Sequence, residues 1–158
     1  MAAVAGAIAD FVGQGLTRFS PEVIVENGGD VYLHPTQERT VGLYAGAGNP
    51  INTLLGILCR PRGRPWGVAS SSGTLGRSLS FGKADLVVAM AETAALADAA
   101  ATAIANRVYD SSAAVRLAAI TFARSIKGLE GCLIIVNNTL EIWGNVELVE
   151  LGRPAKSR

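Results

Sequence analysis

The chain of 158 residues has few of the side chains that catalytic and metal sites most often use. It contains a single histidine, His34, and two cysteines, Cys59 and Cys132. One histidine excludes a multi-histidine zinc site, and any Ser–His or Cys–His dyad would have to include it. Two distant cysteines without a CxxC pair predict no disulfide framework and no local metal cluster.

Charge is also sparse. The chain carries 14 basic and 13 acidic side chains, so the formal net charge is +1 and only 17% of residues are charged. It lacks the positive field that drives binding to phosphate backbones, and we do not expect nucleic acid as a partner. No apolar run reaches the roughly 18–20 residues of a membrane span, and the first residues lack a signal-peptide pattern. We expect a cytoplasmic protein without a membrane partner.

Small and aliphatic side chains dominate what is present. Hydrophobic residues make up 49% of the sequence, but aromatic residues only 6%. This composition excludes disorder and predicts a core of alanine, valine, leucine and isoleucine. The length is that of one domain, which we expect to span residues 1–152, followed by a short basic tail at 153–158.

Apolar residues recur at helical spacing over residues 2–16 and predict a helix. This helix starts without an N-cap residue, as though preceding chain had been removed. Its exposed apolar side chains indicate either a homodimer or a missing amino-terminal segment. The apolar residues at this spacing are Val4, Ile8, Phe11, Val12 and Leu16.

The remaining chain groups into blocks of strands and blocks of helix. Asn27–Asp30 supplies the glycines of a tight turn, so residues 23–33 predict a hairpin. Long helices are expected over 93–107 and 112–127. Further strands are expected at 41–44, 54–59, 66–70 and 85–90, and a closing meander at 132–136, 140–143 and 146–151; segment 54–59 also fits a buried helical turn. Separate blocks favour an α+β fold, with an antiparallel or mixed sheet packed against helices.

Asp98 and Thr102 lie one turn apart on the expected helix 93–107, so their oxygen atoms can converge on one point. A hard cation such as Mg²⁺ takes one or two carboxylates and leaves places for water and substrate phosphates. The alternative interpretation is structural: the acid interacts favourably with a helix dipole, and the threonine bonds back to a backbone carbonyl.

The segment from Ser70 to Lys83 is rich in small residues whose amides and hydroxyls can surround an anion, with Arg77 and Lys83 adding positive charge. It is not a Walker A motif, because five residues separate Gly76 from Gly82 and alanine follows the lysine. A solvated Gly/Ser loop without a ligand is the alternative.

The Asn27–Asp30 segment is first of all a turn, although two adjacent glycines also let a ligand lie against bare backbone. A serine hydrolase would combine one of the serines 70–72 with His34 and Asp30, but no G-x-S-x-G elbow is present. Cys59, which precedes an arginine, is either a thiol of lowered pKa or a buried, inert one.

Three segments, Asn27–Asp30, Ser71–Gly73 and Ala97–Ala103, occur in the order found in the ApbE-like family of flavin transferases, which the chain resembles over nearly its whole length. Ala97–Ala103 is the most specific, because it matches the family motif whose Asp and Thr bind magnesium. The ending Ile142–Leu148 is similar to an uncharacterised branch of the family. By this resemblance the chain corresponds to the carboxy-terminal two thirds of the family's length.

The resemblance implies an α+β enzyme that splits FAD at its pyrophosphate and moves FMN onto a threonine of an acceptor protein, with Mg²⁺ as cofactor. Asp98 and Thr102 would be the metal ligands. No catalytic residue is assigned, because Gly76–Lys83 replaces the histidine-containing segment of the transferases. The alternative is a non-catalytic or accessory protein on the same scaffold, in sulfur assimilation or cofactor metabolism. The site for the flavin, or another diphosphate-bearing ligand, would comprise Gly28, Gly29, Asp30, Ser71, Ser72, Gly73, Arg77 and Lys83.

Overall fold

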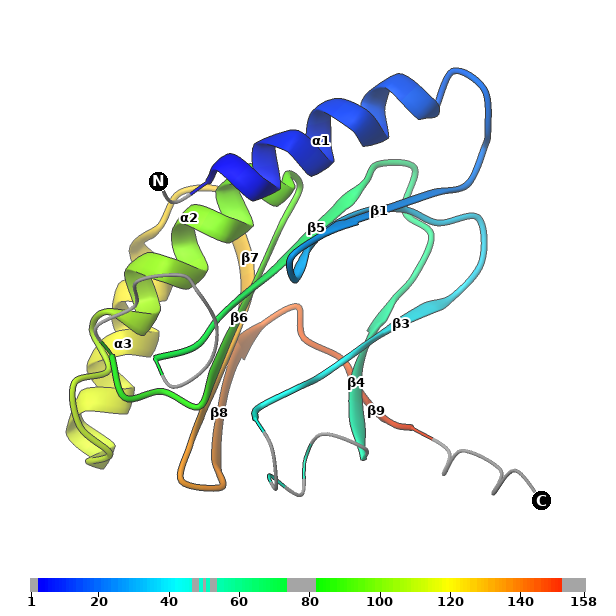
Figure 1. The fold of residues 1–158 in the computed structure, drawn as a ribbon. Helices are drawn as coiled ribbons and strands as arrows, with labels where there is room; N and C mark the ends of the chain where they lie inside the picture. The colour runs from blue at the N-terminus through cyan, green and yellow to red at the C-terminus, as the bar shows by residue number, and fades with distance from the viewer. Residues whose placement is uncertain (1–2, 47–48, 50, 52–53, 74–81, 152–158) are drawn as a thin grey trace.

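The computed structural model describes residues 3–46, 49, 51, 54–73 and 82–151. Within these residues, helices and strands follow one another much as the sequence predicts (Figure 1). In chain order they are α1 (Val4–Leu16), β1 (Val23–Asn27), β2 (Asp30–His34), β3 (Arg39–Gly42), β4 (Leu55–Cys59), β5 (Trp66–Ser71), β6 (Leu86–Ala91), α2 (Ala94–Ala105), α3 (Ala113–Ser125), β7 (Leu129–Val136), β8 (Thr139–Gly144) and β9 (Leu148–Glu150).

The strands form two antiparallel sheets. The larger has the order β1-β2-β5-β6-β7-β8 and the smaller the order β3-β4-β9. Because side chains alternate along a strand, the central strand β6 supplies both faces of the larger sheet. Val87 and Ala89 enter the core beneath the helices, whereas Leu86 and Val88 enter the core shared with the smaller sheet. The result is three layers, with helices, large sheet and small sheet stacked in that order (Figure 1).

Helices α2 and α3 lie close to the large sheet because their buried sides are largely alanine. Ala97, Ala101 and Ala119 are fully buried there. Both helices start at a side-chain cap, because the hydroxyls of Thr93 and Ser112 each accept an amide hydrogen from the first turn. Both predicted helices are confirmed, and with the antiparallel sheets they confirm the α+β fold class.

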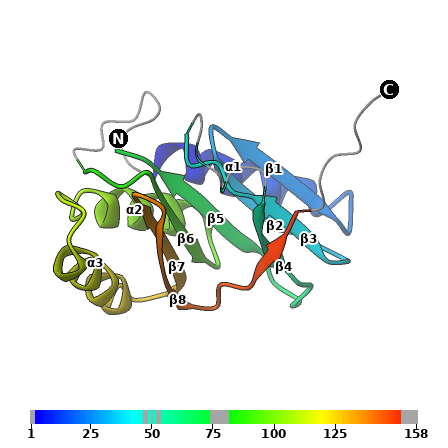
Figure 2. The ribbon, with the colours of Figure 1, turned by 90° about the horizontal axis from the view of Figure 1, so that it is seen from below.

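The small sheet covers part of the opposite face (Figure 2). The prediction of a closing three-stranded meander is wrong in its last strand: β7 and β8 pair, but β9 pairs with β4, where Leu148 aligns with Ile57. Gly144 adopts a left-handed conformation, with φ of 79°, where the chain leaves the large sheet. Segment 54–59, for which a helical turn was the alternative, forms the strand β4.

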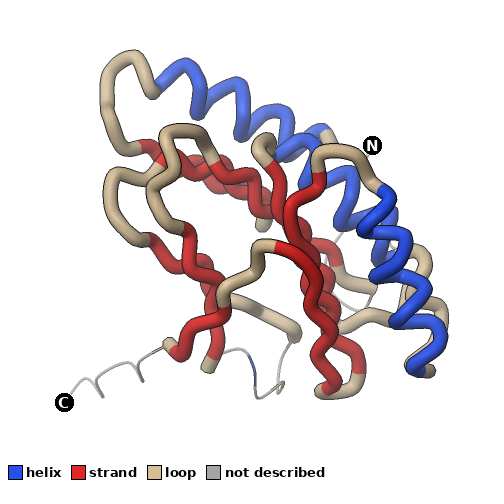
Figure 3. Tube along the Cα trace, turned by 180° about the vertical axis from the view of Figure 1, so that it is seen from behind, coloured by secondary structure: helices blue, strands red, loops and turns tan. Residues whose placement is uncertain are grey.

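Helix α1 packs against α2, β1 and β2 on the outside of the molecule (Figure 3). Its inner side is made of Gly6, Ala9, Asp10 and Gly13. A Cβ atom on Gly6 would lie 2.3 Å from the Ala94 carbonyl oxygen, so only glycine permits this approach to α2. The helix begins without a side-chain cap, as predicted.

Other sequence predictions have clear outcomes. Cys59 and Cys132 are buried free thiols, which agrees with the interpretation of Cys59 as a buried, inert residue. Among the described residues, no helix is long and apolar enough to cross a bilayer. The predicted basic tail at 153–158 lies outside the described residues.

Candidate functional site

A cavity of about 810 Å³ lies between the large sheet and the segment that begins with β3. Its wall is mostly apolar, with Val31, Val68 and Val88 from the large sheet and Val41 and Leu43 from the opposite side. The volume falls within the roughly 300–1,000 Å³ typical of small-molecule sites. The sequence predicts a strand in this region but does not predict that β3 forms one wall of a cavity.

One edge of the cavity is polar and combines two segments named from the sequence. Gly28 and Gly29 have φ values of 66° and 101°, which glycine adopts most readily and which make the β1–β2 turn tight. The Gly29 amide donates to Glu26 Oε1 at 2.8 Å, and Ser70 Oγ donates to the Gly29 carbonyl at 3.5 Å. The structure thus brings Gly28 and Gly29 together with Ser71 and Ser72 around one cavity.

Asp30, the first residue of β2, meets Asp98 of α2, and we call these two residues the carboxyl pair. Strand alternation turns Asp30 toward the helices, whereas the next residue, Val31, faces the cavity. Both acids are buried, with exposed fractions of 6% and 9%. The sequence-based prediction assigns Asp30 to the flavin site and Asp98 to the metal site, whereas in the structure the two carboxyl groups are in contact.

Burial raises the pKa of Asp30 from 3.8 to about 7, and the Asp98 carboxyl adds to the shift through its charge and through a hydrogen bond. The backbone of Ser70 opposes this shift, and the charge of Glu26 adds to it. Two carboxyl groups in contact do not both ionise without compensating positive charge. Asp30 therefore takes up a proton more readily than an ordinary aspartate does.

Two buried oxygen atoms, Asp30 Oδ1 and Ser71 Oγ, have no hydrogen-bond partner in the part of the chain that the structure describes. Ser71 follows Ala69 on the side of β5 that faces the helices. Thr102 is half-buried, one turn beyond Asp98 on α2. Carboxylate and hydroxyl oxygens are suitable ligands for a hard cation.

No group of three or more His, Cys, Asp or Glu side chains that could hold a metal gathers among the described residues. A cation at the carboxyl pair would therefore need hydroxyl, carbonyl, water or ligand oxygens to complete its coordination. The binding roles of the residues named here stay predictions.

Helix α1 holds Asp98 in place. The Gly6 backbone amide donates to Asp98 Oδ2 at 3.1 Å. In return, Asp10 of α1 accepts the amide hydrogens of Ala94 and Ala95 at 2.8 and 2.9 Å, at the start of α2. Asp98 thus contacts a helix start, as the structural alternative supposed, but the helix is α1 and not its own. Sequence reasoning missed both contacts, because no local signal indicates which distant amide a carboxylate meets.

Other predicted site residues lie elsewhere. The Gly73 backbone amide donates to the Ala84 carbonyl and the Lys83 amide to the Val108 carbonyl, and neither Gly73 nor Lys83 lines the cavity. The pKa of Asp110 is lowered chiefly by hydrogen bonds from Ser112, with a smaller contribution from the charge of Lys83. Arg77 lies outside the described residues. Among the residues that the structure describes, no lysine or arginine lines the cavity.

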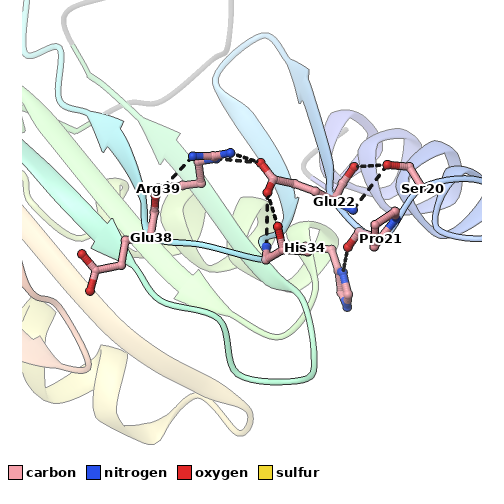
Figure 4. A network of polar contacts seen from close by, with 7 residues as sticks. Ser20, Pro21, Glu22, His34, Glu38 and Arg39 are labelled. Atoms are coloured by element: carbon pink, nitrogen blue, oxygen red, sulfur yellow. Dashed lines mark hydrogen bonds and ion pairs between the residues drawn. The ribbon is translucent and has the colours of Figure 1, made fainter.

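The hydrolase alternative does not fit the geometry. His34 and Asp30 are the two ends of β2, about 13 Å apart along an extended strand. The His34 ring contacts the Pro21 carbonyl, close to the Glu22–Arg39 ion pair (Figure 4). Burial raises the pKa of the Cys59 thiol to about 11, against the opposing charge of Arg62, so this thiol is not an activated nucleophile.

Residues 1–137 match the model of a protein family described as "AbpE bacteria". The chain belongs to this ApbE-like family. The match includes the β1–β2 turn, the end of β5 and all of α2, so both members of the carboxyl pair and the polar edge of the cavity lie within it.

Curated relatives extend the match. The UPF0280 protein of Methanosarcina acetivorans is 38% identical over 147 residues, covering 92% of this chain and 57% of the relative. The UPF0280 protein of Methanocaldococcus jannaschii is 39% identical over 155 residues, covering 95% of this chain and 62% of the relative. The ApbE-like chain thus spans about three fifths of the length of these relatives, and their names state no activity.

The crystal structure of the ApbE protein from Thermotoga maritima MSB8 has a similar fold. Its TM-score to this chain is 0.61, with 21% sequence identity, covering 86% of this chain and 48% of that one. At this identity the likeness concerns the fold alone, and it agrees with the α+β architecture.

Proposed function

We propose that this ApbE-like chain binds FAD together with Mg²⁺ at the carboxyl pair, and that it takes part in transferring FMN to a threonine of an acceptor protein. The carboxyl pair carries this proposal. Its two buried acids do not line the cavity but lie on the helix side of the β1–β2 turn, whose glycines do line it, and the cavity is large enough for a flavin. Asp30 Oδ1 and Ser71 Oγ lack partners in the described part of the chain. Membership of the family supports the proposal.

The negative charge of the site favours binding of a cation over direct binding of an anion. Glu26, Asp30 and Asp98 are acidic, and no lysine or arginine among the described residues lines the cavity. Two unit charges 4 Å apart interact by about 4 kcal/mol at an effective dielectric constant near 20. A diphosphate would be repelled by this edge unless a cation lay between them. Mg²⁺ fits, because it accepts one or two carboxylates and completes its shell with phosphate oxygens.

Each part of the site has a task in this proposal. The apolar wall of the cavity receives the flavin ring, and the Gly28–Gly29 turn lets the diphosphate approach the backbone. Asp30 and Asp98 hold the metal, and Thr102 adds a hydroxyl oxygen. When bound, Mg²⁺ stabilises the charge that develops on phosphate oxygens during phosphoryl transfer.

Isothermal titration of the metal-free protein with FAD, with and without Mg²⁺, tests the binding step. We expect binding that weakens at least about 10-fold without Mg²⁺, and by a similar factor in Asp98→Asn. The asparagine still accepts the Gly6 amide through its carbonyl oxygen, so the fold is retained. Asp110→Asn makes the same chemical change at a carboxylate that is not part of the carboxyl pair and accepts the Ser112 amide, so it is the matched control. Equal FAD binding by Asp98→Asn and the control would contradict the proposal.

The transfer step needs its own readout. Attack of a threonine hydroxyl on the FMN phosphorus of FAD forms FMN-threonine and releases AMP. Mass spectrometry of a threonine-containing acceptor protein, with chromatography of AMP, detects both products. FAD binding without either product favours the second candidate, an accessory protein in sulfur assimilation or cofactor metabolism. The distance of His34 from Asp30 favours that candidate, because the chain's one histidine cannot act as a base there.

A further inference from the structure

Helix α1 turns the opposite side toward the protein from the side that an ordinary surface helix buries. Its small residues face the protein, and its large apolar residues face outward. Gly6, Ala9 and Gly13 are buried, whereas Val4, Ile8 and Phe11 are exposed. An amphipathic helix on a protein surface normally turns its large apolar side chains inward. The outward side of α1 therefore has the composition of a covered surface.

The size of this apolar surface matches one half of a stable interface. Phe11 is 81% exposed, and Phe19, just beyond the helix, is 86% exposed. A covered aromatic side chain buries about 150–250 Å², so with its aliphatic neighbours the surface offers on the order of 700 Å². Monomers rarely expose contiguous apolar patches above about 300–600 Å². A standard interface buries about 800 Å² per partner. The aliphatic neighbours are Val4, Ile8, Val12 and Leu16.

The spacing along the centre of this surface fits a second copy of the same helix. Val4, Ile8, Phe11 and Gly15 follow one another at intervals of four, three and four residues, the seam of a paired helix. These four residues are called the outer stripe here. The intervals are the same when counted from either end, so an antiparallel copy presents matching positions, as a two-fold interface requires.

We propose that α1 is a homodimer interface in which the outer stripe packs antiparallel against that of a second copy. Phe11 then packs beside Ile8 of the partner subunit, and Gly15 beside Val4 of the partner subunit. Space exists for this at Gly15, because no atom lies within 4 Å of the position that its Cβ would take. The helices can therefore approach closely at both ends of the contact.

The charge distribution also suits a self-contact. The one charged side chain of α1 is Asp10, and it is buried against the start of α2. Like charges therefore do not face one another when two copies of the outer stripe meet. Helix α3, in contrast, carries the exposed Arg124 and the half-buried Arg116, which pairs with Glu141, so its outer side includes charge.

Sedimentation equilibrium of the chain tests the proposal directly. We expect a dimer at micromolar concentration and at least about a 10-fold weaker association in Phe11→Asp, whose side chain is exposed in the monomer. Leu117→Asp places the same charge on an exposed leucine of α3 and should leave association unchanged. Circular dichroism of both variants checks that they are folded. A monomeric wild-type chain, or equal weakening by both substitutions, overturns the proposal and assigns α1 to another occupant, such as a further segment or another protein.

Cross-linking tests the alignment separately. A mixture of Ile8→Cys and Phe11→Cys chains, differing in tag length, should form the mixed disulfide dimer at least about 5-fold faster than either chain mixed with Leu117→Cys. Cys59 and Cys132 are buried and do not compete. Equal rates for all pairs, or a preference for a pair that the antiparallel alignment separates, overturn the alignment.

Discussion

Asp98 of α2 accepts the backbone amide of Gly6 in α1 at 3.1 Å. The same two helices are joined in the other direction by Asp10, which accepts two amides at the start of α2. Each helix thus supplies a buried carboxylate to the other's first turn. The candidate metal ligand is therefore part of the packing of α1, and its position depends on a helix that contributes no residue to the cavity wall.

We expect Asp10→Ala to destabilise the protein by about 1–3 kcal/mol, because the Ala94 and Ala95 amides would lose their acceptor at a buried helix start. Chemical denaturation at one fixed protein concentration measures the change. Gln14→Ala alters an exposed residue of the same helix and should change stability by less than about 0.5 kcal/mol. Similar losses in both variants would mean that Asp10 does not cap α2.

We expect Gly82→Ala to be strongly destabilising, because the new Cβ would lie 1.9 Å from the Ala105 carbonyl oxygen. Backbone atoms cannot move aside as a flexible side chain can, so the cost should exceed about 2 kcal/mol. Gly42→Ala is the control, since its Cβ would meet its nearest atom, in Leu151, at 3.7 Å. Thermal melting should separate the two variants by several degrees, and coincident melting curves would refute the expectation.

Glu130 should matter more for stability than Glu92. Burial alone would raise the pKa of Glu130, but hydrogen bonds from Arg62 and Arg64 outweigh it, and the pKa falls below its ordinary 4.5. Glu130→Gln leaves the mostly buried Arg62 without its ion-pair partner and should cost about 3 kcal/mol at pH 7. Glu92→Gln removes a more exposed partner of Arg64 and should cost at most about 1 kcal/mol.

The sign of the Glu130 effect with pH follows from its lowered pKa. The ionised carboxylate stabilises the folded state above pH 4.5, and this contribution is lost as pH falls through the folded-state pKa. Unfolding curves of wild type and Glu130→Gln should therefore converge between pH 5 and pH 3, in the approximate range set by this linkage. A difference independent of pH would show that lost packing, not charge, is responsible.

Both thiols should be unreactive in the folded protein. Burial raises the pKa of Cys59 to about 11 and that of Cys132 to about 12. Because the thiolate is the reactive form, neither should be alkylated by iodoacetamide at pH 8 within an hour, whereas both should react in denaturant. Mass spectrometry counts the added groups. Alkylation of either residue without denaturant would reveal local opening of the core.

Much of the fold could be predicted because local signals agree with the final packing. The glycines of the β1–β2 turn and the caps Thr93 and Ser112 each fix a boundary through their own backbone chemistry. The destination of β9 could not be predicted in this way. Its sequence indicates a strand, but its partner is β4, far away along the chain, and no local preference selects between β8 and β4.

The candidate site was predictable in its parts but not in its assembly. Spacing on a helix singles out Asp98, and turn chemistry singles out Gly28 and Gly29. Contact between Asp30 and Asp98 arises only when β2 and α2 pack together. Helical periodicity in α1 likewise identifies an apolar side, but it cannot tell that glycine and alanine, the smaller side, face the protein.

The pairing of β4 with β9 has a consequence for how the chain acquires its cavity. In the small sheet, β3 pairs with β4, and β4 pairs with β9, the last strand of the described chain. During synthesis, residues 23–91 leave the ribosome well before that strand exists. Pairing of β4 with β9 brings together segments that are distant in the sequence, and such a contact forms slowly compared with a hairpin. We therefore expect the cavity wall that β3 forms to reach its final position late in folding, after the helices have packed on the opposite face of the large sheet.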